Sequence, residues 1–377
     1  MVRVGIIGTG NIGKQHIELL ESGAVTDAEL TATTSRSSTS QPGKPRHFTD
    51  YITMLESGMV DAVIIATPTM NHAECAREAF ARGIHVLVEK PVAMSMAEAN
   101  SLLDEVPSTI KFAVMLNQRF HPAYREIKAM MDQSVIGDLH RFSWTMTAWY
   151  RPDIYYRVSN WRGTWRGEGG GLLINQCIHN LDILQWLFGL PSALTAKANF
   201  GRYHAIDVED EVTSMMSFAG GTTGILIASS GEAPGLNRLE IIGDKGMISF
   251  DDQVITLHQA DQRVSTHCAT TTEMFGMPTF EEHKINAGEP VNQHAAVIQN
   301  FIDAIAADRP LLTPATEGLG SLQLANAMLL SAWQGSPVDL PIDAQAHQDM
   351  LDARIAASQL RRAESLDVTI DMEKSYR

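Results

Sequence analysis

The sequence predicts an α/β protein with two main domains: a doubly wound parallel sheet over residues 1–120, then an α+β domain with an antiparallel sheet over residues 121–342. Three observations predict this fold class. A short apolar run at the N-terminus leads directly into a G-x-G-x-x-G motif. Strand and helix patterns then alternate through the first third of the chain. Strand patterns joined by Gly- and Asp-rich turns follow one another in the middle of the chain.

The length and composition exclude several classes of protein. At 377 residues the chain is too long for one ordinary domain. Its 29 Lys and Arg against 44 Asp and Glu give a net charge of −15, the wrong sign for binding a nucleic-acid backbone. No apolar run approaches the roughly 20 residues of a membrane span. Cys75, Cys177 and Cys268 show no disulfide or zinc spacing. A strand pattern from Val2 leaves no room for a signal peptide. We therefore expect a cytoplasmic protein.

The first strand is expected over residues 2–7, and the helix that follows it begins within Gly8-Thr9-Gly10-Asn11-Ile12-Gly13. In such a motif Gly8 allows the tight turn, Gly10 lets a pyrophosphate approach the backbone, and Gly13 lets helix and strand pack closely. The free N–H groups at the helix start then hold the phosphates. The motif therefore predicts dinucleotide binding, with a glycine turn that serves only packing as the alternative.

The second strand, residues 30–34, ends without the carboxylate that hydrogen-bonds the ribose of NAD. Ser35, Arg36 and Ser37 stand there instead. A 2′-phosphate would meet no repulsion, and Arg36 could bind it with two hydrogen bonds. We therefore expect NADP(H) to be favoured over NAD(H). The alternative is a polar loop with one solvated arginine.

Further buried strands are expected over residues 60–66, 85–88 and 112–116, with a helix over 71–82. Thr67-Pro68-Thr69 and Glu89-Lys90-Pro91 follow two of these strands. They lie at the carboxyl edge of the sheet, where open α/β sheets bind ligands. Lys90 at this edge indicates a functional group, although an exposed lysine at a strand end is the alternative.

The middle of the chain predicts the second domain. After a helix over residues 123–132, strands are expected over 141–149, 194–200, 211–218, 222–229, 238–242, 247–250 and 254–258. Helices should follow over 295–307 and 317–333. Residues 343–377 are interpreted as a C-terminal extension, with a helix over 344–365.

One segment of the second domain concentrates reactive side chains. It starts at Trp161-Arg162, passes three successive glycines at 169–171, and continues as a helix in which Asn175 and His179 share a face. A histidine suits proton transfer near neutral pH, so His179 is the best acid–base candidate, with a structural histidine as the alternative. The acidic run 207–211 is interpreted as a solvated strand entry and not as a metal site. No zinc, P-loop or serine-hydrolase motif occurs.

In combination these motifs resemble one family. G-T-G-N-I-G is followed by A-T-P-T-x-N-H (66–72), V-E-K-P (88–91), N-x-R-F-x-P (117–122) and G-G-G…H-x-x-D (169–182). Together they are similar to the glucose–fructose oxidoreductase/inositol dehydrogenase/rhizopine catabolism (Gfo/Idh/MocA) family, over residues 2 to about 342. The resemblance implies a Rossmann domain, then a domain on a large, open, mostly antiparallel sheet. It also implies homodimers or homotetramers that associate through this sheet.

The resemblance also implies roles for single residues. Lys90 corresponds to the lysine that polarises the reacting oxygen, and His179 to the histidine that exchanges a proton with it. Asn175 stands where many relatives carry aspartate, so an amide would position a substrate hydroxyl there. The substrate pocket would include Lys90, Asn117, Trp161, Arg162, Asn175 and His179. The cofactor would contact the glycine-rich motif at 8–13 and the segment 35–37. It would also contact Thr67, Pro68, Asn71, His72, Glu89, Lys90 and Asn117.

The function expected is hydride transfer between NADP(H) or NAD(H) and a carbinol or carbonyl carbon of a sugar, sugar derivative or cyclic polyol. We expect no metal, nucleic-acid or membrane partner. One alternative is a sensor that binds dinucleotide and sugar without turnover. Another is a reductase of non-sugar carbonyl compounds or dihydrodiols.

Overall fold

The computed structural model describes residues 1–35, 45–251, 253–359, 364 and 366. Its first part is a six-stranded, wholly parallel sheet in the order β3-β2-β1-β4-β5-β6. This order, with β1 in the middle, is the doubly wound Rossmann arrangement that the sequence predicts. The strands are β1 Val2–Ile7, β2 Ala28–Thr34, β3 Arg46–Phe48, β4 Ala62–Ile65, β5 His85–Val88 and β6 Phe112–Val114.

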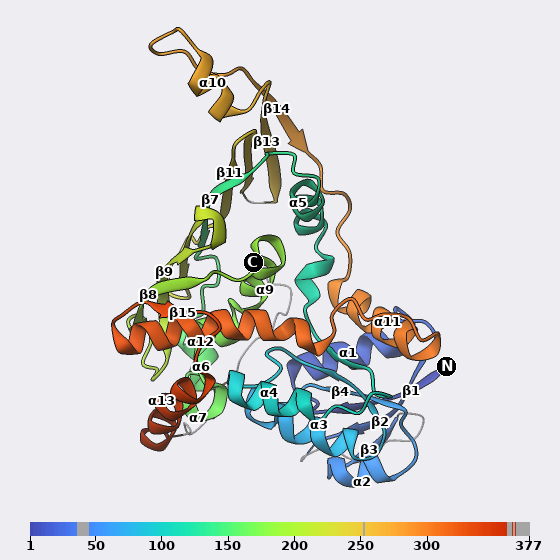
Figure 1. The fold of residues 1–377 in the computed structure, drawn as a ribbon. Helices are drawn as coiled ribbons and strands as arrows, with labels where there is room; N and C mark the ends of the chain where they lie inside the picture. Colours follow the sequence, from blue (N-terminus) through green and yellow to red (C-terminus); the bar gives the residue numbers. More distant parts are fainter. Residues whose placement is uncertain (36–44, 252, 360–363, 365, 367–377) are drawn as a thin grey trace.

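Helices cover both faces of this sheet because the strands are apolar on both faces. The connecting helices are α1 Asn11–Glu21, α2 Tyr51–Glu56, α3 His72–Phe80 and α4 Met96–Asp104. A later helix, α11 (Gln293–Ala306), completes one face. Its Val297, Ile298 and Phe301 are buried in one cluster with Val4 and Ile6 of β1, and Figure 1 shows α11 beside α1. Although sequence order assigns α11 to the second domain, its apolar side chains belong to the core of the first.

The second part of the protein is built on a nine-stranded sheet in the order β14-β13-β12-β11-β7-β10-β9-β8-β15. Only β7 and β10 pair in parallel, and the other neighbours are antiparallel. The predicted large, mostly antiparallel sheet is thus confirmed. Its strands are β7 Leu139–Met146, β8 Ala193–Phe200, β9 Glu209–Ser217, β10 Thr223–Ser229, β11 Asn237–Gly243, β12 Gly246–Asp251, β13 Val254–Ala260, β14 Phe280–Ile285 and β15 Val338–Asp339.

Helices line one side of this sheet and connect it to the first (Figure 1). The longest, α12 (Gly318–Gln334), packs against β8, α9 and α4, so it contacts both parts of the molecule. The others are α5 Pro122–Asp132, α6 Asp153–Arg157, α7 Trp165–Glu168, α8 Leu172–Asn175, α9 Ile178–Phe188, α10 Val264–Thr270 and α13 Ala344–Ala357. The helix predicted over 344–365 is therefore shorter than expected. Throughout the described ranges, no helix combines the length and apolarity that crossing a bilayer requires.

Candidate active site

The glycine-rich turn lies between β1 and α1, at the carboxyl edge of the first sheet. Gly8 has φ +98°, and a Cβ there would lie 2.7 Å from the carbonyl oxygen of Ala66. A Cβ on Gly13 would lie 2.0 Å from the carbonyl oxygen of Gly8. Gly10, by contrast, has nothing within 4 Å of such a Cβ, so the backbone before Asn11 and Ile12 is open to a ligand. The cradle and the start of α1 thus fit a dinucleotide phosphate.

The side chain of His72 bridges two loops at the carboxyl edge of the first sheet. Its Nδ1 lies 2.8 Å from the carbonyl oxygen of Pro91, and its Nε2 lies 3.0 Å from that of Thr67. The ring is buried, and burial lowers its pKa. Because each ring nitrogen lies beside a main-chain carbonyl, His72 joins the two loops beyond β4 and β5. A contact between His72 and the cofactor stays a prediction. Pro68 and Asn71 flank it, at the ends of the short turn Thr69–Asn71.

Glu89 is likewise engaged inside the protein. His16 Nε2 donates to Glu89 Oε1 at 2.8 Å, and the amide of Lys90 donates to the other oxygen at 3.3 Å. Burial would raise the pKa of Glu89, but the hydrogen bond from His16, together with the charges of His16, His294 and Lys90, outweighs burial and brings the pKa to about 2. Glu89 therefore fixes the E-K-P turn against α1, a role that the sequence pattern did not indicate.

Lys90 reaches from this turn to the second domain. Its Nζ donates to the main-chain carbonyl oxygen of Asn175 at 2.6 Å. Burial lowers the pKa of Lys90, and the charges of Glu89, Tyr155 and Glu168 act against that effect. The predicted pair of Lys90 and Asn175 is therefore in contact, although through the backbone of Asn175.

The predicted single helix through Asn175 and His179 is broken in the structure. Helix α8 ends at Asn175 and α9 starts at Ile178, with Gln176 and Cys177 between them. Asn175 Nδ2 donates to Glu168 Oε1, so a buried carboxylate holds its amide. His179 is 5% exposed, and its Nδ1 has no hydrogen-bond partner among the described residues. Burial, and then the charge of Lys90, lower its pKa well below the ordinary value. A neutral imidazole of this kind can accept a proton.

Glu168 is the residue of this site that the sequence reading missed. It ends the short helix α7 and is 2% exposed. Besides holding Asn175, it accepts a hydrogen bond from the amide of Gly163 at 2.6 Å. Burial raises its pKa to about 7, while Gly163 and the charges of Arg162 and Lys90 act in the opposite direction. No motif spacing marks this glutamate, because its partners come from three separate segments.

The Trp161-Arg162 pair lies beside Glu168. The Arg162 guanidinium carbon is 4.3 Å from the ring centroid of Trp161 and 4.7 Å from that of Tyr155, so the cation packs on two aromatic rings. Arg162 Nε makes no hydrogen bond within the described part of the chain. Three of the expected substrate residues therefore interact with the Glu168 carboxylate, Asn175 through a hydrogen bond and Arg162 and Lys90 through their charges.

The acidic run 207–211 is not the solvated strand entry that the sequence predicts. Glu209 and Asp210 are both fully buried. Glu209 accepts 2.9 Å hydrogen bonds from the amides of Gly171 and Leu173, and so holds the glycine run in place. Burial raises the pKa of Glu209 to about 7. The expectation of a solvated strand entry fails because polar main-chain groups, and not water, surround the start of this strand.

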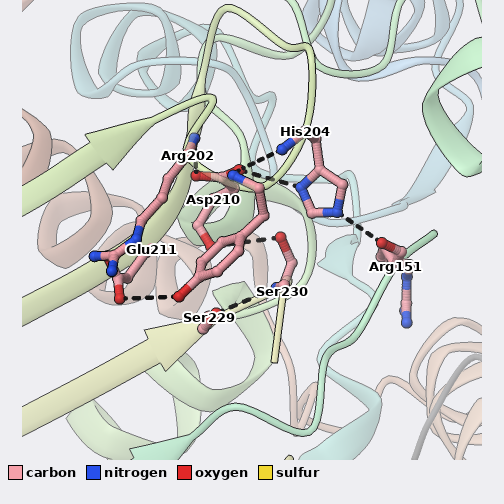
Figure 2. A network of polar contacts seen from close by, with 9 residues as sticks. Arg151, Arg202, His204, Asp210, Glu211, Ser229 and Ser230 are labelled. Atoms are coloured by element: carbon pink, nitrogen blue, oxygen red, sulfur yellow. Dashed lines mark hydrogen bonds and ion pairs between the residues drawn. The ribbon is translucent and has the colours of Figure 1, made fainter. Parts of the chain in front are cut away.

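Asp210 organises the neighbouring loop (Figure 2). Its carboxylate accepts hydrogen bonds from the amides of Arg202, Tyr203 and His204, and lies 3.1 Å from His204 Nδ1. His204 Nε2 lies 2.7 Å from the carbonyl oxygen of Arg151. Burial opposes the charge of His204, but these contacts raise its pKa. They also lower the pKa of Asp210 against the effect of burial. The network therefore anchors the segment that follows β7.

The N-x-R-F and H-x-x-D motifs meet in the fold. Arg119 Nε and Nη2 donate to the two carboxylate oxygens of Asp182 at 2.8 and 2.6 Å, and both side chains are buried. This pair fixes the turn Asn117–Phe120 against α9, next to His179. Asn117 is 2% exposed, and its Oδ1 accepts no hydrogen bond from the described residues.

Other expected features lie partly outside what the structure describes. Arg36 and Ser37 fall outside the described residues. Ser35 is described, and its carbonyl oxygen lies 3.2 Å from His47 Nε2. Within the described ranges, no group of three or more His, Cys, Asp or Glu side chains could hold a metal ion.

Comparisons with known proteins agree with this architecture. Residues 2–117 match the model of an oxidoreductase family with an NAD-binding Rossmann fold, and residues 124–249 match the Gfo/Idh/MocA C-terminal domain. The chain is 26% identical over 353 residues to the uncharacterized oxidoreductase YrbE of Bacillus subtilis, covering 89% of this chain and 96% of YrbE. It is 27% identical over 341 residues to inositol 2-dehydrogenase of Rhizobium meliloti, covering 88% of this chain and 96% of that protein.

A solved structure is similar across most of the chain. The WlbA dehydrogenase of Bordetella pertussis, in complex with NADH and UDP-GlcNAcA, superposes with a TM-score of 0.73 and 25% identity, covering 91% of this chain and 99% of WlbA. The two family models lie end to end and correspond to the two sheets. The chain therefore belongs to the Gfo/Idh/MocA family of NAD-binding oxidoreductases.

Proposed function

We propose that this protein is an NAD(P)-dependent dehydrogenase or reductase that acts on a CH–OH group of a sugar, sugar derivative or cyclic polyol. One observation carries the proposal: Lys90, which is partly buried, reaches from the first domain to the segment that leads into the buried His179. Lys90 Nζ contacts the backbone four residues before His179, and its charge lowers the pKa of His179. The names of relatives support the substrate class, since they include inositol 2-dehydrogenase and levoglucosan dehydrogenase.

The two side chains have complementary roles. When bound, the nicotinamide dinucleotide accepts or donates the hydride. In oxidation, neutral His179 accepts the proton of the substrate hydroxyl, and the Lys90 ammonium stabilises the alkoxide that develops. Burial removes water that would weaken the effect of this charge. Asn175 and Glu168 position the two groups, and Trp161 and Arg162 border the substrate.

The cofactor preference rests on the end of β2. We expect NADP(H) to be favoured over NAD(H), because Ser35, Arg36 and Ser37 stand where an NAD enzyme carries a carboxylate. The similar structures of WlbA and levoglucosan dehydrogenase were solved with NADH, and that of an oxidoreductase of Agrobacterium radiobacter with NAD+. The NADP(H) preference of this chain is tested at Arg36. Arg36→Asp should weaken NADPH binding selectively. An equal loss for both cofactors, or no loss, would contradict this assignment.

The large sheet is proposed as the surface for a homodimer or homotetramer. Met215 of β9 and Ile225 of β10 are direct cross-strand partners. They are 58% and 41% exposed, so apolar side chains lie in the middle of an open sheet. Burying such a pair against a second copy would be favourable. The cytoplasmic location stays a prediction from the cysteine content.

The experiment that tests the function is nicotinamide absorbance with the purified protein. NADP⁺ and NAD⁺ are each combined with aldoses, inositols, glycosides and nucleotide sugars. We expect turnover of one sugar class. Lys90→Met should lower this turnover at least about 100-fold and retain the affinity for the dinucleotide. Full turnover in the variant would contradict the role of Lys90. Tight dinucleotide binding without any turnover would favour the sensor or a non-sugar substrate.

A further inference from the structure

A cavity opens beside the proposed reaction site. It has a volume of about 620 Å³, within the range of roughly 300–1,000 Å³ that ligand sites span. It lies between the start of α1, the turn Asn117–Phe120 and the ends of β7 and β11. Lys90 and His179 are not among its lining residues, but Asn180 is, directly after His179 in α9. We call it the amide-lined cavity.

The lining of this cavity is polar and carries no full charge. Eight of the seventeen lining residues are Asn or Gln, and none is Asp, Glu, Lys or Arg. Its two histidines, His121 and His294, are kept neutral because burial lowers their pKa, to about 4 for His294. A carboxamide both donates and accepts hydrogen bonds, as a sugar hydroxyl does. A phosphate or carboxylate would leave water without meeting a compensating cation.

Some of these amides still have hydrogen-bonding capacity. Gln15 Oε1, Asn117 Oδ1 and Gln118 Oε1 are buried atoms that accept no hydrogen bond from the described residues. Asn117 is 2% exposed, so its oxygen is costly to leave without a partner. Three acceptors around one cavity suit a ligand that presents several O–H groups.

The cavity also offers apolar ring faces. Tyr124 and Trp149 line it, and both are nearly buried. Trp149 Nε1 donates to Asn180 Oδ1 at 2.9 Å, which ties this wall to the residue after His179. The segment that carries Trp149 is the one anchored by His204 and Asp210. Aromatic faces beside convergent amides suit a sugar ring, which has apolar C–H faces and a polar rim.

We infer that the amide-lined cavity binds an uncharged glycosyl group attached to the ring that reacts at Lys90 and His179. The preferred substrate is then a neutral glycoside or disaccharide, and not a single ring or a sugar charged at its remote end. This inference rests on the proposed function. Binding energy from the remote ring would hold the reacting ring in place.

The test compares single rings with their glycosylated forms. Glucose and myo-inositol are the single rings, maltose, cellobiose and galactinol are their neutral glycosylated forms, and maltose 6′-phosphate is the charged form. We expect kcat/KM for at least one neutral glycosylated form to exceed that of its single ring about tenfold or more. The phosphorylated disaccharide should lose this advantage. Calorimetric titration in the presence of NADPH, which cannot take up a hydride, measures binding separately from turnover.

Two variants address the cavity itself. Val291 lines it and is 48% exposed, so Val291→Trp fills the cavity without disturbing a core. The matched control is Val254→Trp, at a 51% exposed valine of β13 outside the cavity lining. Val291→Trp should abolish the preference for the glycosylated form, and Val254→Trp should leave it intact. Gln118→Met, which removes one amide, should reduce the same preference about tenfold.

The outcomes separate this inference from the proposed function. The inference is wrong if single rings and glycosylated forms have equal kcat/KM, or if maltose 6′-phosphate binds as tightly as maltose. Either result leaves the proposed function unaffected. A preference that persists in Val291→Trp would also overturn the inference. Disaccharide binding that is lost in Val291→Trp, without turnover of any sugar, would support the inference and contradict the function. If no sugar binds or reacts, both are wrong.

Discussion

Replacing Glu168 by glutamine tests whether a buried carboxylate that titrates near neutral pH joins the two halves of the site. Glu168→Gln keeps the shape of the side chain and an oxygen that can accept from Gly163 or Asn175, but it removes the charge. The pKa of Glu168 rises from 4.5 to about 7 on folding because the carboxylate is buried. This rise corresponds to about 3 kcal/mol, since each pH unit is worth about 1.4 kcal/mol.

The sign of the effect follows from proton binding. The folded protein holds the proton of Glu168 more tightly than the unfolded chain does, so its contribution to stability is complete below the unfolded pKa. The contribution is lost as the pH rises through the folded value. The glutamine variant has no such loss. The stability of the variant relative to wild type should therefore increase by about 2 kcal/mol between about pH 5.5 and about pH 8.5.

Guanidinium unfolding followed by tryptophan fluorescence across this pH range measures the difference. Glu209 also has a raised pKa, about 7, mainly because of burial. The charge of Glu168 adds to that rise, so the measured difference also contains the smaller change in the pKa of Glu209. The matched control is Glu273→Gln, at an exposed carboxylate between α10 and β14. A difference between Glu168→Gln and wild type that stays flat with pH, or decreases as the pH rises, would refute the assignment of a buried, neutral-pH titration to Glu168.

Two further predictions concern the proton acceptor and the loop network. His179→Asn should lower kcat about 10²–10⁴-fold with dinucleotide affinity retained, because the variant has no neutral imidazole to take the proton. Stopped-flow turnover measures kcat, and a fluorescence titration with NADPH measures dinucleotide affinity. An unaltered kcat would contradict the role of His179 as proton acceptor. Asp210→Ala should cost about 3 kcal/mol of unfolding free energy, because three amides and His204 lose their acceptor, whereas exposed Asp261→Ala should cost little. The pKa of Asp210 is lowered and that of His204 is raised, so the pair should stabilise the folded protein fully between their ordinary pKa values, 3.8 and 6.5. This stabilisation should decrease at lower pH as Asp210 takes up a proton and at higher pH as His204 loses one. A pH-independent difference in urea unfolding would be inconsistent with this pair.

Much of the first domain was predictable because its signals are local. An apolar run followed by Gly8, Gly10 and Gly13 contains the information for strand, turn and helix within about 12 residues, and the structure has these elements there. The position of Lys90 at a strand end also follows from local pattern. Strand β3 and helices α2 and α4 were missed. Strand β3 and helix α2 are short and carry no clear periodicity.

The break between α8 and α9 was not predictable from spacing. Apolar residues continue at helical intervals through Gln176 and Cys177, so the pattern predicts one helix over Asn175 and His179. The backbone instead turns where Lys90 Nζ meets the carbonyl oxygen of Asn175. That contact joins residues 85 positions apart and is invisible to any local rule.

The parallel sheet and its glycine-rich turn were predictable from the sequence alone, because periodicity and glycine geometry act over a few residues. Only the tertiary structure decided which charges are buried and what they hold. Glu168, Glu209 and Asp210 look like ordinary acidic residues in the sequence, yet each accepts hydrogen bonds from backbone or side chains that order the site. The amide-lined cavity likewise exists only after folding, since its walls come from both parts of the molecule. The physical reason is that the cost of burying a polar group is set by the partners that distant segments bring to it.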